Sequence, residues 1–447
     1  MLPTSGWTDF HDMRDIALFL IVAGGIPFIL RSPAVGIGYW VLIGLMNPHR
    51  FGWGFAYSFP FALVVAVATM IGLVITKQPR QFKGGAAAWV LLAFVAWMCV
   101  TTIFALEQER AVEVLERVLK ILFVTFLALV ALRTREHVLW LVAIIVFSIG
   151  FYGVKGGFFT ITTGGENLVW GPPETFIADN NALALAVIMT IPLFAYFYTL
   201  TARRWIRVAI VVCIALSAVS VFGSYSRGGL LAIAAMSAFL WIKAKHKFSL
   251  GLGVLLLGVG FYSFMPPQWE ARMNTISTYE QDSSAQGRLN TWTMLFNLAV
   301  DRPLVGGGFE PYTREIFRRY LPDYESTHAA HSVYFQVLGE HGFVGLALFL
   351  TFWVLTWRLS RRIIKHTRDD PAVKWAHSLA VMIQVSLVGF FVGGAFLNLA
   401  YWDMPYFLMI ALAVTWHVVR NQTRDSTAPQ PDRPSASYPA RAPVISS

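Results

Sequence analysis

The sequence predicts an all-α integral membrane protein, a polytopic helical bundle, from its composition, its long apolar segments and the placement of its charges. Of the 447 residues, 56% are hydrophobic and 13% are charged, and the mean hydropathy is +0.58. These values lie far from those of soluble globular proteins. Apolar segments of roughly 15 to 22 residues recur along the chain, each long enough to cross or nearly cross a bilayer. Because hydrocarbon requires internally satisfied backbone groups and no barrel-like alternation is visible, these segments are expected to be helices.

The apolar segments define candidate spans, which together predict about 12 transmembrane helices. In order along the chain, the candidate spans are 15–31, 33–47, 57–76, 86–105, 118–132, 138–154, 181–200, 205–223, 229–242, 248–264, 333–357, 376–397 and 405–419. The first run, which begins at Ile16, lacks a small-residue cleavage site, so no cleavable signal peptide is expected. No internal repeat is obvious, which disfavours the many transporters that are built from inverted repeats.

The net charge of +10 is distributed over short loops between the spans, as the positive-inside rule predicts. The basic clusters are Lys77, Arg80 and Lys83; Arg133 and Arg135; Arg203, Arg204 and Arg207; Lys243, Lys245 and Lys247; and the run from Arg358 to Lys374. These loops are predicted to be cytoplasmic. The positive net charge therefore indicates how the chain is oriented in the membrane, and it does not indicate nucleic-acid binding. The segments expected on the outer face are 106–117, 155–180, 224–228, 265–330 and 398–404. Cys99 and Cys213 lie inside apolar spans, which disfavours a disulfide framework.

The chain is predicted to have four parts. They are an N-terminal transmembrane bundle (1–264), a polar loop or lid (265–330, the insertion), C-terminal transmembrane helices (331–420) and a tail (421–447). The tail is rich in Pro, Ser and Arg and is expected to be disordered in the cytoplasm. Within the insertion, apolar residues recur at helical spacing between Leu289 and Ala299, which predicts an amphipathic helix. A second short helix is expected from Tyr312 to Leu321.

Two arginines near the outer face are candidates for binding an anion. Arg227, in a Ser-Arg-Gly-Gly sequence, lies where one span reaches the outer face, a depth at which an arginine is costly unless it is paired or faces a wet cavity. The alternative is an interfacial arginine beside a glycine-rich turn. Arg288 follows Gly287 and opens the amphipathic helix, where its planar guanidinium would suit a phosphate. Its alternative is an ion pair with Asp282 or a cation–π contact with Trp292.

His331 stands at the start of a span and is the candidate general base, because imidazole titrates near neutrality and can take a proton from a hydroxyl. The alternative is a helix-capping or interface histidine. His328, three residues earlier, suggests a zinc site with Asp323, Glu325 or His341, but no third ligand is obvious. The outer face carries no Asp-x-Asp pair or tight carboxylate cluster that would hold Mg²⁺ or Mn²⁺. If the substrate is a diphosphate, arginine or lysine side chains would have to neutralise it.

In their order along the chain, these motifs resemble those of the O-antigen ligase and polymerase superfamily. The motifs are the Ser-Arg-Gly-Gly span end, Gly287-Arg288 followed by Trp292, the turn Gly306-Gly307-Gly308-Phe309, and His331-Ser332 leading to Gly339-Glu340-x-Gly342. In the N-terminal half, Met46-Asn47-Pro48-His49-Arg50 and Tyr152-Gly153-x-Lys155-Gly156-Gly157 are similar to the branch described as O-glycosylation ligases. One departure is Ser332, where members of the family often have Asn. The resemblance covers the chain up to about residue 420.

The resemblance implies a GT-C-like glycosyltransferase, multi-pass in a bacterial inner membrane, with the insertion and the active site facing the periplasm. As an O-antigen ligase, it would transfer a glycan from undecaprenyl diphosphate to lipid A–core oligosaccharide in lipopolysaccharide biosynthesis, with inversion and without a metal or other cofactor. An O-antigen polymerase or a protein O-oligosaccharyltransferase would use the same donor, and a transporter or lipid flippase is a more distant alternative. The expected partners are the donor, the acceptor and membrane lipids, with no nucleic acid, and the expected state is a monomer.

The resemblance also implies roles for single residues. Arg227 and Arg288 would bind the diphosphate, and His331 would act as the base on the acceptor hydroxyl. Beyond the resemblance, Lys155 and His328 are weaker candidates for contact with the diphosphate, and Asp179-Asn180 is a further weak candidate.

Overall fold

The computed structural model describes residues 5–52, 54–77, 80–244, 246–275, 282–324 and 326–427, and the side chains of all of these except 5–12, 250 and 423–427. Within these residues the regular secondary structure is helical and no strand occurs. Every candidate span corresponds to a helix. These helices are α1 (Ser5–Arg31), α2 (Pro33–Met46), α3 (Phe61–Ile75), α4 (Gly85–Ile103), α5 (Gln108–Ala131), α6 (Arg135–Thr162), α7 (Asn180–Leu200), α8 (Arg204–Gly223), α9 (Arg227–Lys243), α10 (Lys247–Phe264), α14 (Val333–His366), α15 (Lys374–Gly393) and α16 (Asp403–Thr427). Short 3₁₀ turns are η1 (Pro48–Phe51), η2 (Phe55–Tyr57), η4 (Pro371–Val373) and η5 (Gly394–Phe396).

Among the described residues, 8 helical segments are long and apolar enough to cross a membrane, judged by length and composition. The helices α2 and α3 are apolar but shorter, and α5, α9 and α16 fall outside this criterion. The chain is therefore a multi-pass helical membrane protein, as the sequence predicts. The number of about 12 spans stays a prediction.

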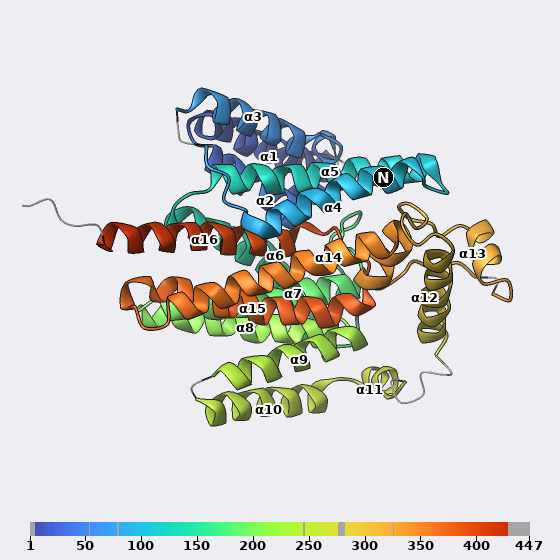
Figure 1. Ribbon diagram of the computed structural model, residues 1–447. Coiled ribbons are helices and arrows are strands. Elements are labelled where there is room, and N and C mark those ends of the chain that lie inside the picture. The colour runs from blue at the N-terminus through green and yellow to red at the C-terminus, as the bar shows by residue number, and fades with distance from the viewer. Residues whose placement is uncertain are drawn as a thin grey trace, which may run out of the picture.

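The long helices lie side by side as a bundle, and the insertion lies across one end of it (Figure 1). We call this the loop end. It carries α11 (Pro267–Asn274), α12 (Ser283–Asp301) and α13 (Arg314–Tyr320). The helix α12 runs across the direction of the bundle helices, whereas the turns that join α7 to α8, α9 to α10 and α14 to α15 lie at the opposite end (Figure 1). The described residues of three basic clusters lie in or beside those turns, so these clusters are separated from the insertion by the length of the bundle.

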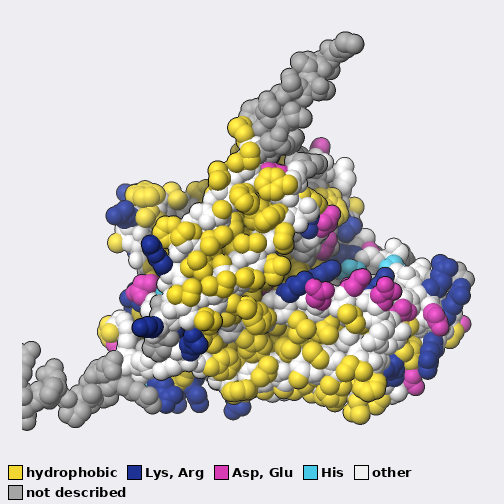
Figure 2. All heavy atoms as spheres, turned by 90° about the horizontal axis from the view of Figure 1, so that it is seen from above, with side chains coloured by type: hydrophobic (Ala, Val, Ile, Leu, Met, Phe, Trp, Pro, Cys, Tyr) yellow, Lys and Arg dark blue, Asp and Glu magenta, His cyan; other side chains and the backbone are white. Residues whose placement is uncertain are grey.

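The core runs along α7, α15 and the first half of α16, where successive residues from Asp403 to Val414 are buried. The outer helices instead expose large apolar side chains. Examples are Trp89, Trp140, Trp205 and Phe248. Hydrophobic side chains cover the broad middle of the face drawn in Figure 2. An apolar surface of this extent would be unfavourable in water, and it suits contact with the hydrocarbon of a bilayer.

Three boundaries differ from those that hydropathy predicts. The helix α6 continues to Thr162, through the start of the expected outer segment 155–180. The helix α5 begins at Gln108 although 106–117 was expected to lie between spans, and its charged first turns include an i,i+4 pair of Glu116 and Lys120 at 2.6 Å. The helix α16 extends to Thr427, so residues 421–427 are helical rather than disordered. The rest of the expected tail lies outside the described residues, as does Lys245 of the fourth basic cluster.

Both helices expected in the insertion are present, as α12 and α13, while α11 was not predicted. The glycine turn 306–308 docks on the start of α14 through backbone hydrogen bonds. Gly307 N donates to the Gly339 carbonyl at 2.8 Å, and Gly308 N donates to the Glu340 carbonyl at 3.0 Å. These bonds attach the insertion to the span that follows it.

Gly342 interrupts α14 where the insertion meets it, with φ 67° and ψ −170°. The next amide, Phe343 N, donates to the Pro303 carbonyl at 2.8 Å instead of continuing the helical pattern. A Cβ on Gly342 would lie 2.5 Å from the Leu304 carbonyl oxygen. Because of this contact and the positive φ, the junction requires glycine.

Candidate active site at the loop end

Arg227 is the first residue of α9, and a capped helix terminus fixes its position. The Ser226 hydroxyl accepts a hydrogen bond from Gly229 N at 3.0 Å, as an N-cap does. In the preceding turn Tyr225 has φ 57°, and its hydroxyl donates to the Gly165 carbonyl at 2.7 Å. The Ser-Arg-Gly-Gly sequence therefore places the guanidinium at a defined point of the loop end.

The guanidinium of Arg227 binds a carboxylate of the insertion. Nη1 donates to Asp282 Oδ2 at 2.7 Å and Nη2 donates to Oδ1 at 3.1 Å, while Nη1 also donates to the Thr275 hydroxyl at 2.7 Å. The hydrogen bond from Arg227 is the main cause that lowers the pKa of Asp282, to about 2. The same carboxylate caps α12 by accepting from Ala285 N at 2.8 Å. Asp282 therefore pairs with Arg227 and not with Arg288, which sequence analysis had considered as its partner.

Arg288 lies in the second turn of α12 rather than at its start, and Nε is shielded from solvent without a hydrogen bond to the described part of the chain. The expected alternative, a cation–π contact with Trp292, is not formed there. Trp292 instead stacks on Phe335 with ring centroids 5.0 Å apart, and Nε1 donates to the Ala330 carbonyl at 2.7 Å. Burial, and next the charge of Arg227, lower the pKa of Arg288. A shielded guanidinium with an unused donor is costly unless an anion completes its bonding.

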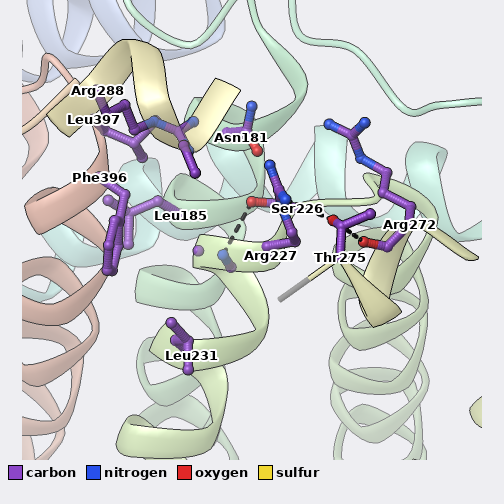
Figure 3. A pocket seen from close by; sticks show the side chains of 14 residues that line it. Asn181, Leu185, Ser226, Arg227, Leu231, Arg272, Thr275, Arg288, Phe396 and Leu397 are labelled. Carbon is purple, nitrogen blue, oxygen red and sulfur yellow. Dashed lines mark hydrogen bonds between the residues drawn. The ribbon is translucent and has the colours of Figure 1, made fainter. Parts of the chain in front are cut away.

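Arg227, Arg272 and Arg288 reach one cavity of about 160 Å³ from three different helices, α9, α11 and α12 (Figure 3). The lining also includes the polar side chains of Asn181, Ser226 and Thr275, and among the described residues no acidic side chain lines it, although Asp282 binds Arg227 beside it. Another part of the wall is apolar, and it is made by Leu185, Leu231, Phe396 and Leu397. This cavity, called the arginine cavity below, therefore combines concentrated positive charge with an apolar wall. Arg272 and Asn181 carry no sequence motif that would have singled them out.

His331 lies just before α14 with φ 43°, a left-handed backbone conformation that is uncommon for residues other than glycine. It lines a second cavity of about 280 Å³, called the histidine cavity below, together with Asp179 and Tyr312. Burial is the main cause that lowers the pKa of His331. The charge of Arg288 adds to the effect, while Asp179 opposes it. The imidazole is therefore neutral at neutral pH, in the form that accepts a proton.

Sequence analysis missed a buried network that forms part of the histidine cavity. The Tyr401 hydroxyl donates to Glu340 Oε2 at 2.6 Å and lies 2.8 Å from His341 Nε2. On its other side, His341 Nδ1 lies 2.7 Å from the Thr101 hydroxyl. These bonds connect α4, α14 and the segment before α16, and Tyr401 lines the cavity. The sequence feature that indicates this network is the adjacent pair Glu340 and His341 inside an apolar span, because buried polar groups need partners.

The two weaker candidates, Lys155 and His328, line neither the arginine cavity nor the histidine cavity. Lys155 lies within α6 with Nζ 6.0 Å from the centroid of the Phe51 ring, and it lines an apolar cavity among α6, α7 and α8 rather than the arginine or histidine cavity. His328 is exposed, and its ring packs so close to Gly287 that a Cβ there would lie 3.2 Å from Nε2. Within the described residues, no group of three or more His, Cys, Asp or Glu is placed to hold a metal. Glu325, one of the possible zinc ligands, lies outside those residues.

Two segments of the chain match the models of known families. Residues 212–350 match the model of a family described as O-antigen ligase. Residues 13–202 match a family of unknown function. No curated protein matches the chain. The first match runs from α8 through the insertion into α14, so it contains Arg227, Arg288 and His331.

Proposed function

Because residues 212–350 belong to the O-antigen ligase family, we propose that the protein transfers a glycan from undecaprenyl diphosphate to lipid A–core oligosaccharide. The observation that carries this proposal is the arginine cavity. Three guanidinium groups meet there beside an apolar wall, with His331 close enough for Arg288 to influence its titration. A lipid-linked diphosphate requires a binding site for the anion and an apolar surface for the start of the lipid chain.

In this proposal Arg227, Arg272 and Arg288 bind the donor diphosphate. The unused Nε donor of Arg288 is available to a phosphate oxygen. The first isoprene units lie along Leu231 and Phe396, toward the spans α9 and α15. Because the arginines supply the positive charge that stabilises the leaving diphosphate, we propose that the transfer needs no metal.

His331 is the proposed base for the acceptor hydroxyl. The acceptor oxygen attacks the anomeric carbon of the glycan as its proton passes to the neutral imidazole. The bond from the anomeric carbon to the phosphate oxygen breaks, and the electron pair leaves with the diphosphate. Attack from the face opposite the leaving group inverts the anomeric centre. His331 lines a cavity that shares Leu397 with the arginine cavity, which supports a base lying beside the donor site.

The distribution of charge supports an orientation with the loop end in the periplasm. The basic clusters around 203–207, 243–247 and 358–374 lie in turns at the opposite end of the bundle (Figure 1). By the positive-inside rule that end is cytoplasmic. We therefore propose a bacterial inner-membrane protein whose active site faces the periplasm.

The test is deletion of the gene in its native host, with complementation by the wild type, by His331→Gln and by His246→Gln. His246 is an exposed histidine next to α10 at the opposite end, so it controls for loss of any histidine. We expect the deletion and His331→Gln to leave lipid A–core without O-antigen, and His246→Gln to restore it. Loss of chain length alone would indicate an O-antigen polymerase. Loss of glycans from proteins alone would indicate a protein O-oligosaccharyltransferase, and unchanged glycans of all three kinds would refute the proposal.

A further inference from the structure

The histidine cavity adjoins a larger cavity that is lined mainly by the N-terminal half of the chain. This larger cavity, of about 690 Å³, lies among α2, α5 and the start of α16. Arg117 and Phe176 line both cavities, so the two share a boundary. We call the two adjoining cavities together the Arg117 groove. His331 lines the histidine cavity, and Arg50 lines the larger one.

The lining of the Arg117 groove is suited to hydroxyl groups. Side-chain amides of Asn47, Gln336 and Asn398 line it, and an amide carries both donors and acceptors. Asn47 Nδ2 donates to the Gly44 carbonyl and Gln336 Oε1 accepts from Ala400 N, whereas Asn398 Oδ1 has no partner among the described residues. Aromatic side chains, among them Trp40 and Phe176, supply apolar faces for the carbon–hydrogen surfaces of sugar rings. A pocket with aromatic walls and amides of both polarities recognises chains that carry many neutral hydroxyls.

The charges of the groove differ from those of the arginine cavity. Its carboxylates are Glu174 and Asp403 in the larger cavity and Asp179 and Glu310 in the histidine cavity, and its cations are Arg50 and Arg117, since the His331 imidazole is neutral. Arg50 is already bound to Glu174, with Nη1 2.7 Å from Oε2. The groove therefore carries no excess of positive charge, and a phosphate group inside it would meet carboxylates.

We propose that the Arg117 groove binds the acceptor, and that the part of the acceptor inside it is an uncharged oligosaccharide. This inference rests on the proposed glycosyl transfer and adds the recognition of its second substrate. It gives the segment 13–202 a role, because Arg50, Arg117, Glu174 and Phe176 all belong to that segment. Strand addition of an extended polypeptide is disfavoured, because that mode needs a sheet edge and the described residues contain no strand.

Arg117 provides the first test, because it is the one charged side chain that lines both cavities. Binding of the host's core oligosaccharide, with its phosphates removed, is measured by calorimetry on the full chain in detergent. Arg117→Ala should raise the Kd about tenfold or more, since hydrogen bonds to a charged group are lost. Lys120→Ala is the matched control, since Lys120 lies one turn further along α5, pairs with Glu116 and lines neither cavity. An unchanged Kd for Arg117→Ala would overturn the assignment of the groove.

The second test separates this inference from the proposed function. In a transfer assay with the undecaprenyl-diphosphate-linked glycan, Arg117→Ala should raise the acceptor KM about tenfold while leaving the donor KM unchanged. The same oligosaccharide with a phosphate on the accepting sugar should have a KM at least tenfold higher in the wild type. Equal KM values for the two acceptors, or transfer to a Ser/Thr peptide in preference to both, would overturn the inference while leaving glycosyl transfer intact. A wild type that transfers to none of them would instead refute the proposed function.

Discussion

The carboxylate of Asp282 occupies the same edge of Arg227 that a diphosphate would use. Two hydrogen bonds, at 2.7 and 3.1 Å, join the two side chains in a bidentate arrangement. A phosphate needs that planar edge for its strongest contact. We expect the donor to displace the carboxylate, so Asp282→Asn should tighten donor binding by removing the competing charge.

The size of the effect follows from the environment of the pair. Hydrogen bonds to charged groups contribute roughly 1.5–3 kcal/mol. The two side chains are 15% and 17% exposed, so water weakens the pair and the lower end of that range applies. About 1.4 kcal/mol corresponds to a tenfold change, so the Kd for undecaprenyl diphosphate should fall about tenfold. Asparagine retains the acceptor that Ala285 N needs, so the cap of α12 is kept.

Calorimetric titration of the full chain in detergent with undecaprenyl diphosphate measures this change directly. Asp301→Asn is the control, because Asp301 ends the same helix and its carboxylate accepts from the Tyr320 hydroxyl at 2.7 Å, away from the arginine cavity. Its Kd should match that of the wild type. A Kd for Asp282→Asn that is unchanged or weaker would show that the carboxylate positions Arg227 instead of competing for it, and the reasoning above would be wrong.

Four further predictions concern the base, the pH at which it titrates, the fold and the metal. His331→Gln should lower kcat by roughly 10²–10⁴-fold with the donor Kd unchanged, and retained kcat would refute its role as base. The acid limb of kcat/KM should lie below the usual histidine pKa, because burial and Arg288 favour the neutral imidazole. Arg288→Gln should shift that limb to higher pH, and an unmoved limb would contradict the coupling. Gly342→Ala should lower the Tm in detergent, since this glycine-only backbone conformation costs other residues roughly 1–3 kcal/mol and the new Cβ meets the Leu304 carbonyl. Gly253→Ala, where a Cβ meets nothing within 4 Å, should not lower it, and equal losses would argue against strain at the junction. Transfer should persist in EDTA, and inhibition reversed by Mg²⁺ would show that the arginines are insufficient.

The positions of the helices were predictable because hydropathy is a property of consecutive residues. Each candidate span lies largely or wholly within a helix, and the amphipathic pattern from Leu289 to Ala299 lies within α12. The boundaries at Gln108 and Thr162 were missed because helices continue past the apolar segment, where side chains no longer have to be apolar. Hydropathy detects the hydrocarbon layer and not the end of the helix.

The partners within the site were not predictable in the same way. Asp282 binds Arg227, which is far away in sequence, and not Arg288 on its own helix. Tyr401 reaches the histidine cavity from the segment before α16. Such pairings depend on how α9, α12 and α14 meet, and no spacing along the chain encodes that. Short motifs located the arginines and the histidine, whereas the side chains that complete their surroundings come from elsewhere in the fold.

The backbone bonds between the glycine turn and α14 have a consequence for how substrates arrive. Because Gly307 and Gly308 donate to carbonyls of the span itself, this turn of the insertion cannot lift away without losing both hydrogen bonds. The lipid-linked donor would then have to slide in sideways from the bilayer, between α9 and α15, while the acceptor approaches along α5. The donor is thereby drawn from a two-dimensional pool, and its rate of capture depends on its surface density in the membrane. Dilution of the vesicles at constant lipid composition would leave the donor-dependent rate per enzyme unchanged.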